Sequence, residues 1–292
     1  MPYQHLAVIG DSILWGQGLI PEHKIHNIVW AARGNGSAPV NLAHSGATIG
    51  IGVASGQAAI NGEIPIAHPT ILEQVAAFSD RPSDVDLLLI NGGINDVGIS
   101  RIANPLIQRD YLAGRIKVHC YDDMKTLLGA ALKKFPNARV IVTGYHPILS
   151  PRSEPVRIPN FLNLHGIGLP SFLSFIPIVG KVVSTCMQFW QESNGYLAQA
   201  AMEAGAGNGR VTFVPSPFTE ANAVFADDPW LFGISSNFNP QDEVAADRHE
   251  VCEVQFGEIE EILSLEQCFR ASAGHPNVKG AAAIAGAIIA AL

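Results

Sequence analysis

The sequence has few charged residues for a soluble protein. Of its 292 residues, 15% are charged and 48% are hydrophobic, whereas an average soluble domain has about 25% charged residues. Intrinsic disorder requires the opposite balance, low hydrophobicity with high net charge, and is therefore excluded. The net charge of -8 comes without any basic cluster. This disfavours nucleic acid as a partner, because nucleic-acid binding depends on neutralising phosphates.

Targeting and membrane signals are also lacking. Residues 1–5 lead into the first apolar run without the basic region and cleavage site of a signal peptide. Two alternatives stay open: a protein that remains inside the cell, or an exported one whose leader has been removed. The most hydrophobic window, residues 167–183, is interrupted by Pro170, Pro177 and Lys181. We therefore expect no transmembrane segment.

Metal-binding patterns are missing as well. The four cysteines form no C-x-x-C pair and show no zinc spacing with histidine. His23 and His26 are spaced as on one face of a helix, but no carboxylate or cysteine nearby completes a metal site. Cys252 and Cys268 enclose a short polar segment, and they are candidates for a disulfide if the protein is exported.

Short runs rich in Val, Ile and Leu recur between longer helix-like segments. This pattern is typical of buried parallel strands joined by crossover helices. We expect five strands, at residues 6–10, 40–44, 85–91, 139–144 and 210–214. The clearest helical patterns cover residues 110–135, 182–204 and 277–292. The alternation of the two patterns predicts a layered α/β fold.

Two long stretches interrupt this alternation. Residues 150–180 contain five prolines among many apolar side chains, and residues 216–270 combine little periodicity with many acidic residues. Neither stretch has the composition of a flexible linker. We therefore expect residues 1–292 to form one domain with two insertions. The apolar insertion fits two interpretations equally well, a part of the core or a lid or acyl groove beside a site.

Polar residues follow several of the predicted strands, where open parallel sheets bind their ligands. Ser12 comes after the first strand, Gly46 after the second and Asn95 after the third, while His275 precedes the last helix. A serine hydroxyl becomes a good nucleophile when an imidazole takes its proton, and the resulting oxyanion needs preorganised N–H donors. We expect Ser12 to attack and His275 to act as base and then acid. The backbone N–H groups of Ser12 and Gly46 and the side-chain amide of Asn95 are the expected oxyanion donors.

In their order along the chain, these segments resemble the motif blocks of the SGNH (GDSL) hydrolase family of esterases and lipases. Residues 10–12 (Gly-Asp-Ser) resemble the first block, Gly46 the second, residues 93–96 (Gly-Ile-Asn-Asp) the third and His275 the last. Residues 143–148 are similar to the end of the family's fourth strand. The resemblance implies a flavodoxin-like, three-layer α/β/α sandwich with a five-stranded parallel sheet. It also implies hydrolysis of a small ester or lipid through an acyl-enzyme, without metal or cofactor.

The sequence departs from the family pattern at one position. Three residues before the histidine, where the family usually has an Asp that orients the imidazole, this chain has Ser272. A backbone carbonyl, the Ser272 hydroxyl or a carboxylate of the acidic insertion are the alternatives for the orienting group. The candidate carboxylates are Asp227, Asp228, Asp242 and Asp247. We favour a carbonyl or Ser272, which makes the site a Ser-His dyad.

Each site residue also has a purely structural interpretation. Ser12 alone would cap a helix, and Gly46 and Gly93 alone would be turn glycines. For Asp11 and Asp96 we prefer the structural role, in which Asp11 braces the turn of the nucleophile and Asp96 makes hydrogen bonds within its loop.

Two other functions stay open at this point. One is deacetylation of a carbohydrate, and the other is non-catalytic binding of a small ligand, which only the Ser272 departure supports. No G-x-S-x-G elbow, G-x-G-x-x-G or P-loop occurs, so an α/β-hydrolase and a nucleotide cofactor are both disfavoured. His44 and His146 fall near the predicted strand ends, where contact with substrate is one interpretation and a buried core histidine is the one we favour.

Overall fold

The fold is built on a five-stranded parallel sheet. The computed structural model describes residues 2–57, 61–164, 175–207, 209–233 and 271–292. The strands lie in the order β2-β1-β3-β4-β5, with each neighbouring pair parallel. Their bounds are β1 Leu6–Ile9, β2 Val40–Asn41, β3 Leu87–Ile90, β4 Arg139–Thr143 and β5 Val211–Val214. The predicted flavodoxin-like sheet is confirmed, and all five strands lie within their predicted ranges.

The strands form where the sequence has its continuous apolar runs. All residues of β1 and β3 are buried, as expected for strands covered on both faces. The register pairs Leu6 of β1 with Leu87 of β3, and Leu87 with Arg139 of β4. The parallel strands all end at the same edge of the sheet, so the loops that follow β1, β2 and β3 open side by side.

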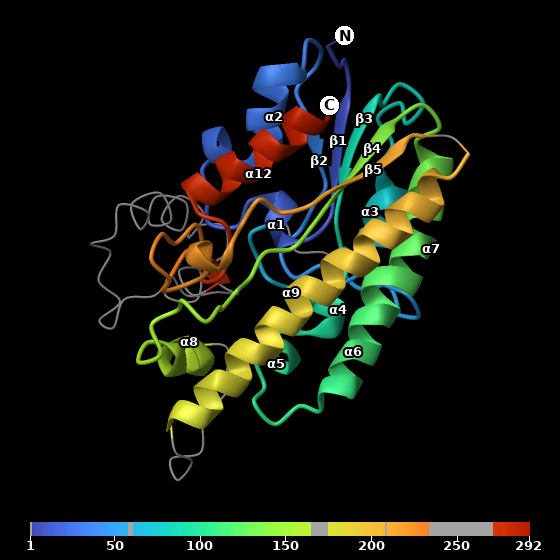
Figure 1. The fold of residues 1–292 in the computed structure, drawn as a ribbon. Coiled ribbons are helices and arrows are strands. Elements are labelled where there is room, and N and C mark those ends of the chain that lie inside the picture. The colour runs from blue at the N-terminus through green and yellow to red at the C-terminus, as the bar shows by residue number, and fades with distance from the viewer. Residues whose placement is uncertain (1, 58–60, 165–174, 208, 234–270) are drawn as a thin grey trace.

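Helices cover both faces of the sheet (Figure 1). Helices α2 and α12 pack on each other over one face, while α3, α7 and α9 cover the other. The helices before β4 are α1 Ser12–Trp15, α2 Ile25–Arg33, α3 Ile71–Ala77, α4 Ile94–Val97, α5 Ile99–Ile102, α6 Arg109–Lys117 and α7 Asp123–Lys134. Those after β4 are α8 Ile158–Leu164, α9 Phe175–Gly205 and α12 Val278–Ala291. Short 3₁₀ turns occupy Pro21–His23 and Glu220–Asn222.

The helix predicted at residues 110–135 contains an irregularity. A five-residue π turn, Val118–Asp122, separates α6 from α7 within one continuous helical segment. The apolar periodicity of the sequence continues through residues 118–122, so it predicts one regular helix and does not predict the π turn. Such π turns are rare and occur frequently at functional sites.

The apolar insertion contributes to the core and extends a helix. Helix α9 is described from Phe175, earlier than the predicted residue 182, and it includes Pro177 near that end, where a proline is tolerated. In α8, Ile158, Phe161 and Leu162 are buried in the hydrophobic core. This part of the insertion therefore has the core role, one of the two interpretations of residues 150–180.

Some predictions fall outside the described residues. Residues 165–174 of the apolar insertion and 234–270 of the acidic insertion belong to this group, and with them the proposed Cys252–Cys268 disulfide. Within the described residues, Cys120 and Cys186 are free and buried. No helix in the described part of the chain is both long and apolar enough to cross a membrane.

Two buried histidines predict a loss of stability in mild acid. Burial lowers the pKa of both His26 and His146 to about 4, whereas both residues titrate near 6.5 when unfolded. Between pH 6.5 and 4 only the unfolded chain binds these protons, so the free energy of unfolding falls across that window. We expect about 3 kcal/mol lost per histidine by pH 4.

Urea unfolding at pH 7.5, 5.5 and 4.5 measures this loss. His146→Gln, which keeps a hydrogen-bond donor, is expected to remove about half of the pH dependence, and His5→Gln near the surface serves as control. An equally steep pH dependence in the His146→Gln and wild-type proteins would contradict the prediction.

Candidate active site

The structure brings together the two ends of the chain that carry the predicted nucleophile and base. Ser12 is the first residue of α1, and His275 lies in the turn before α12. The Nε2 atom of His275 is 2.7 Å from the Oγ atom of Ser12. This is the hydrogen bond that a base needs in order to take the serine proton.

A short antiparallel pairing holds the His275 turn. The N–H of Phe232 donates to the carbonyl of His275, and the N–H of Gly274 donates to the carbonyl of Phe232, both at 2.8 Å. The N–H of His275 donates to the carbonyl of Ser272 at 3.0 Å. The start of the acidic insertion therefore positions the backbone of the histidine.

His146 supports the same turn from inside the protein. It is buried, and its Nε2 lies 3.1 Å from the carbonyl oxygen of Gly274, next to His275. Its ring stacks on Phe218 with 5.0 Å between ring centroids. Phe161 of α8 lies on the other side, 3.3 Å from the point where a Cβ on Gly274 would be. His146 is thus a core histidine as expected, and it packs directly behind the turn of His275.

Asp11 fixes the turn that presents Ser12. Its carboxylate accepts hydrogen bonds from the N–H of Ile13 at 2.9 Å, the amide of Asn91 at 2.8 Å and the hydroxyl of Tyr145 at 2.8 Å. The N–H of Asp11 donates back to Asn91 Oδ1 at 2.9 Å. Asp11 is fully buried, and burial raises its pKa despite these donors. Asp11 therefore caps α1 and braces it against the ends of β3 and β4, as the structural interpretation predicted.

The three predicted oxyanion donors each have an N–H group that can bind a ligand. Among the described residues, the backbone N–H groups of Ser12 and Gly46 donate to no hydrogen-bond acceptor. Gly46 has φ 77°, and a Cβ there would lie 2.7 Å from the carbonyl oxygen of Ile66, so only glycine fits. One amide hydrogen of Asn95 is bonded to the carbonyl of Ala47 at 2.9 Å, which leaves the other for a ligand.

Asp96 has the structural role that we expected, because its carboxylate connects two loops. Its carboxylate accepts the N–H of Ile49 at 3.0 Å, which ties the Asn95 loop to the Gly46 loop. Burial raises the pKa of Asp96, although the Ile49 N–H opposes this. Asp96, His119 and Asp123 also lie within 4.8 Å of one another, the only such trio of potential metal ligands in the described part of the chain.

The candidate groups for orienting His275 fall into two sets. Ser272 is fully buried and adjoins Gly18, where an added Cβ would lie 2.7 Å from the Ser272 Cβ. Asp227 and Asp228 are half exposed or more and pair with Arg152 and Lys279 at the surface. Asp242 and Asp247 lie outside the described residues.

Comparison with known protein families identifies the family of this chain. The profile of the GDSL-like lipase/acylhydrolase family matches residues 8–283, nearly the whole chain. The chain belongs to this family. The predicted SGNH (GDSL) resemblance is thereby confirmed, and the family places the chain among the carboxylic ester hydrolases. No curated protein is significantly similar to the chain in sequence.

Two solved structures of lipolytic enzymes are similar to this chain. The extracellular lipase from Streptomyces rimosus superposes with a TM-score of 0.56 at 16% identity, over 99% of this chain and 100% of that one. A phospholipase A1 from Streptomyces albidoflavus gives a TM-score of 0.47 at 15% identity, covering 81% of this chain and 89% of its own. At 16% identity, the similarity to the Streptomyces rimosus lipase shows that the two proteins share the SGNH hydrolase fold.

This GDSL-family chain also buries charges that the sequence patterns did not single out. Glu63 is buried beneath α1 and accepts hydrogen bonds from the Trp15 indole and the Gly18 N–H, both at 2.5 Å. The Nζ of Lys24 lies 3.8 Å from the Trp15 ring centroid. Burial raises the pKa of Glu63 and lowers that of Lys24. Neither residue stands at a strand end, so neither could be picked out by the rule that found Ser12.

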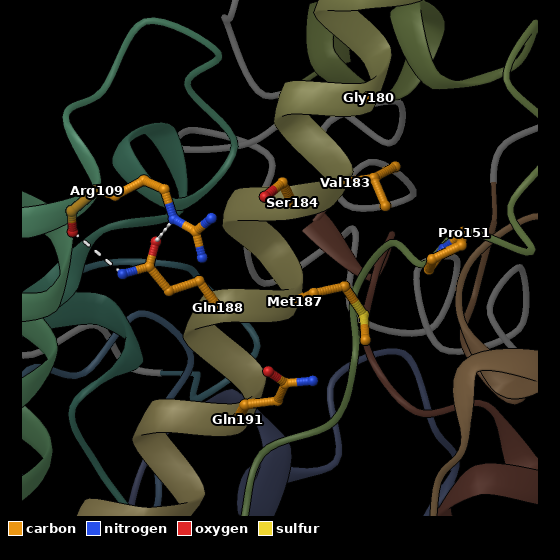
Figure 2. Close-up of a pocket in the computed structure, with 8 residues that line it drawn as sticks. All are labelled: Arg109, Pro151, Gly180, Val183, Ser184, Met187, Gln188 and Gln191. Carbon is orange, nitrogen blue, oxygen red and sulfur yellow. Dashed lines mark hydrogen bonds between the residues drawn. The ribbon is translucent and has the colours of Figure 1, made fainter.

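A separate pocket runs along one face of α9 (Figure 2). It has a volume of about 410 Å³. Figure 2 shows Arg109 and Pro151 on either side of the helix, with the side chains of Ser184 and Met187 between them. None of the predicted site residues lines this pocket, so it lies apart from the Ser12–His275 pair.

Proposed function

We propose that this member of the GDSL family is a serine esterase that hydrolyses small carboxylic esters or lipids through an acyl-enzyme on Ser12. The hydrogen bond of 2.7 Å between Ser12 Oγ and His275 Nε2 carries the proposal. It joins a hydroxyl and an imidazole that lie 263 residues apart in the sequence, at the edge of the sheet where the strands end.

The reaction proceeds in two halves. His275 takes the proton of Ser12 as Oγ attacks the ester carbonyl, and it then gives that proton to the departing alcohol oxygen. In the second half His275 takes a proton from water as the water attacks the acyl carbonyl, and it returns this proton to Ser12 Oγ as the acyl–oxygen bond breaks and the acid leaves. In both halves the oxyanion accepts hydrogen bonds from the N–H groups of Ser12 and Gly46 and from the free amide hydrogen of Asn95.

The turn that carries His275 supports one choice of orienting group. The Ser272 carbonyl accepts the backbone N–H of His275, which keeps Ser272 close to the histidine. We propose that a backbone carbonyl or the Ser272 hydroxyl orients the imidazole in place of the family's usual Asp. Loss of that carboxylate weakens the stabilisation of the imidazolium but leaves the oxyanion donors in place.

A fluorophosphonate probe tests the activated nucleophile. We expect wild-type protein to be labelled covalently, with the adduct mapped to the peptide that contains Ser12. His275→Gln is expected to slow labelling by at least about 100-fold, because the hydroxyl loses its base. Tyr111→Phe, an exposed site on α6, is the matched control. Labelling that maps to another residue, or that persists in Ser12→Ala, would overturn the proposal.

A series of p-nitrophenyl esters with acyl chains from acetyl to palmitoyl identifies the substrate class. Esterase or lipase action predicts turnover that extends to chains longer than acetyl. Activity confined to acetyl esters would support carbohydrate deacetylation instead.

A further inference from the structure

We propose that Arg115 is a positioning residue of the oxyanion hole, which holds Asn95 in place through the neighbouring backbone carbonyl of Asp96. The inference rests on the proposed function, because it assigns Arg115 to the site through Asn95. Arg115 lies on α6, 20 residues beyond Asn95 in the sequence, and none of the family blocks includes it. Its Nη2 donates a hydrogen bond to the Asp96 carbonyl.

The guanidinium of Arg115 is itself oriented by two further side chains. Its Nη2 lies 2.9 Å from His119 Nε2, so the imidazole accepts there. The other ring nitrogen, Nδ1, donates to Asp123 Oδ2 at 2.7 Å. Each of the three residues follows the previous one by four positions, one turn further along the same helical segment. Arg115, His119 and Asp123 thus form a hydrogen-bonded row that ends on the oxyanion loop.

The π turn brings this row against the loop. His119 lies within the π turn, and Asp123 is the first residue after it. A Cβ on Gly93 would lie 3.0 Å from Cys120 Sγ and 3.2 Å from the carbonyl oxygen of His119. Gly93 has φ 117°, so glycine is required there both for its backbone conformation and for this close approach. The π turn therefore packs directly behind residues 93–96.

On its other side the loop is attached to the Gly46 loop. The Asn95 amide donates to the Ala47 carbonyl, and the Asp96 carboxylate accepts the Ile49 N–H. Asn95 is therefore clamped between two partners, the Gly46 loop in front and Arg115 behind. Removal of the rear partner frees the Asp96 carbonyl and lets the Asn95 amide shift relative to the oxyanion. A misplacement of about 1 Å can cost about 100-fold in rate.

Two side chains of this row, His119 and Asp123, could instead hold a metal ion together with Asp96, since these three residues offer ligand atoms within 4.8 Å of one another. The geometry favours the hydrogen-bonded row. His119 Nδ1 already donates to Asp123, and the Arg115 guanidinium at the other ring nitrogen would repel a cation. Metal binding is therefore an alternative outcome of the test below.

Arg115→Met tests the rear clamp, with Lys117→Met as the matched control. Lys117 lies on the same helix, is half exposed and pairs with Asp122 at the surface. We expect Arg115→Met to lower kcat by about 10- to 100-fold with little change in KM, because the lost contact acts on the transition state. Lys117→Met is expected to leave both constants unchanged. Arg115→Lys should restore only part of kcat, because an ammonium group lacks the guanidinium fork.

The route through Asn95 is tested by a double-mutant cycle. If Arg115 acts by positioning Asn95, adding Arg115→Met to Asn95→Ala costs less than about threefold more, since the positioned group is already gone. His119→Gln, a milder change, is expected to show a smaller kcat loss with the same dependence on Asn95. It keeps the inference testable if Arg115→Met does not fold.

Three outcomes would overturn the inference. One is wild-type kcat in both Arg115→Met and His119→Gln, and another is a loss that multiplies fully with that of Asn95→Ala. The third is calorimetric binding of Zn²⁺ to the wild type that disappears in Asp123→Asn, together with loss of activity on chelation. Failure of the proposed function looks different, because the wild type itself would then show no hydrolysis that depends on Ser12.

Discussion

Ser12→Ala is expected to reduce kcat on short p-nitrophenyl esters by about 10⁴- to 10⁶-fold. Without Oγ no acyl-enzyme forms, and the imidazole of His275 has no hydroxyl to activate. A residual rate above that in water should persist, because the oxyanion donors remain. The N–H of residue 12 is one of these donors, and alanine keeps it.

The measurement is steady-state hydrolysis with active-site titration, and circular dichroism to show that the variant is folded. Ser12→Ala is a good probe because alanine suits the first position of a helix. Ser184→Ala, a serine on α9 in the pocket of Figure 2, is the matched control and should retain wild-type turnover. Unchanged hydrolysis in Ser12→Ala would contradict the nucleophile assignment outright.

Asp11→Ala is expected to lower the free energy of unfolding by about 3 kcal/mol. The change leaves the Ile13 N–H, the Asn91 amide and the Tyr145 hydroxyl without their acceptor in a buried site, at about 1–3 kcal/mol for each group that stays unsatisfied. The Ile13 N–H is the group that Asp11 caps at the start of α1, so its loss already includes the N-cap contribution of about 1 kcal/mol. Part of this loss is offset because a buried carboxylate, whose pKa burial raises, no longer has to be desolvated.

Urea unfolding at pH 7 measures the effect of Asp11→Ala. Asp80→Ala, which removes an exposed carboxylate paired with Arg81, should change stability by less than about 0.5 kcal/mol. Tyr145→Phe removes only one of the three donors and should cost less than Asp11→Ala. Equal stability of Asp11→Ala and wild type would show that Asp11 is not the anchor of this turn.

Three of the candidate site residues could be predicted from the sequence because each of them follows a predicted strand. Ser12, Gly46 and Asn95 each follow an apolar run that becomes a strand, so the rule that sites gather at strand ends found them without coordinates. The strands of the sheet could also be predicted, because they are continuous runs of Val, Ile and Leu in the sequence.

The residues that hold the candidate site in place were harder to predict from the sequence. Asn91 and Tyr145 donate hydrogen bonds to Asp11, from which they are 80 and 134 residues apart in the sequence. No local sequence pattern around these residues predicts the contacts. The π turn was missed because Val118–Asp122 is compatible with an ordinary helix. The π turn packs closely against Gly93, a residue that is distant from it in the sequence.

The distance in sequence between Ser12 and His275 has a consequence for how activity is acquired. The proposed nucleophile, Ser12, belongs to the first strand-to-helix connection, whereas the proposed base, His275, precedes the last helix and follows every strand of the sheet. A molecule whose sheet has formed but whose α12 has not docked would hold Ser12 without His275 beside it. On the proposed mechanism, hydrolysis therefore reports on the docking of α12 as well as on the formation of the sheet.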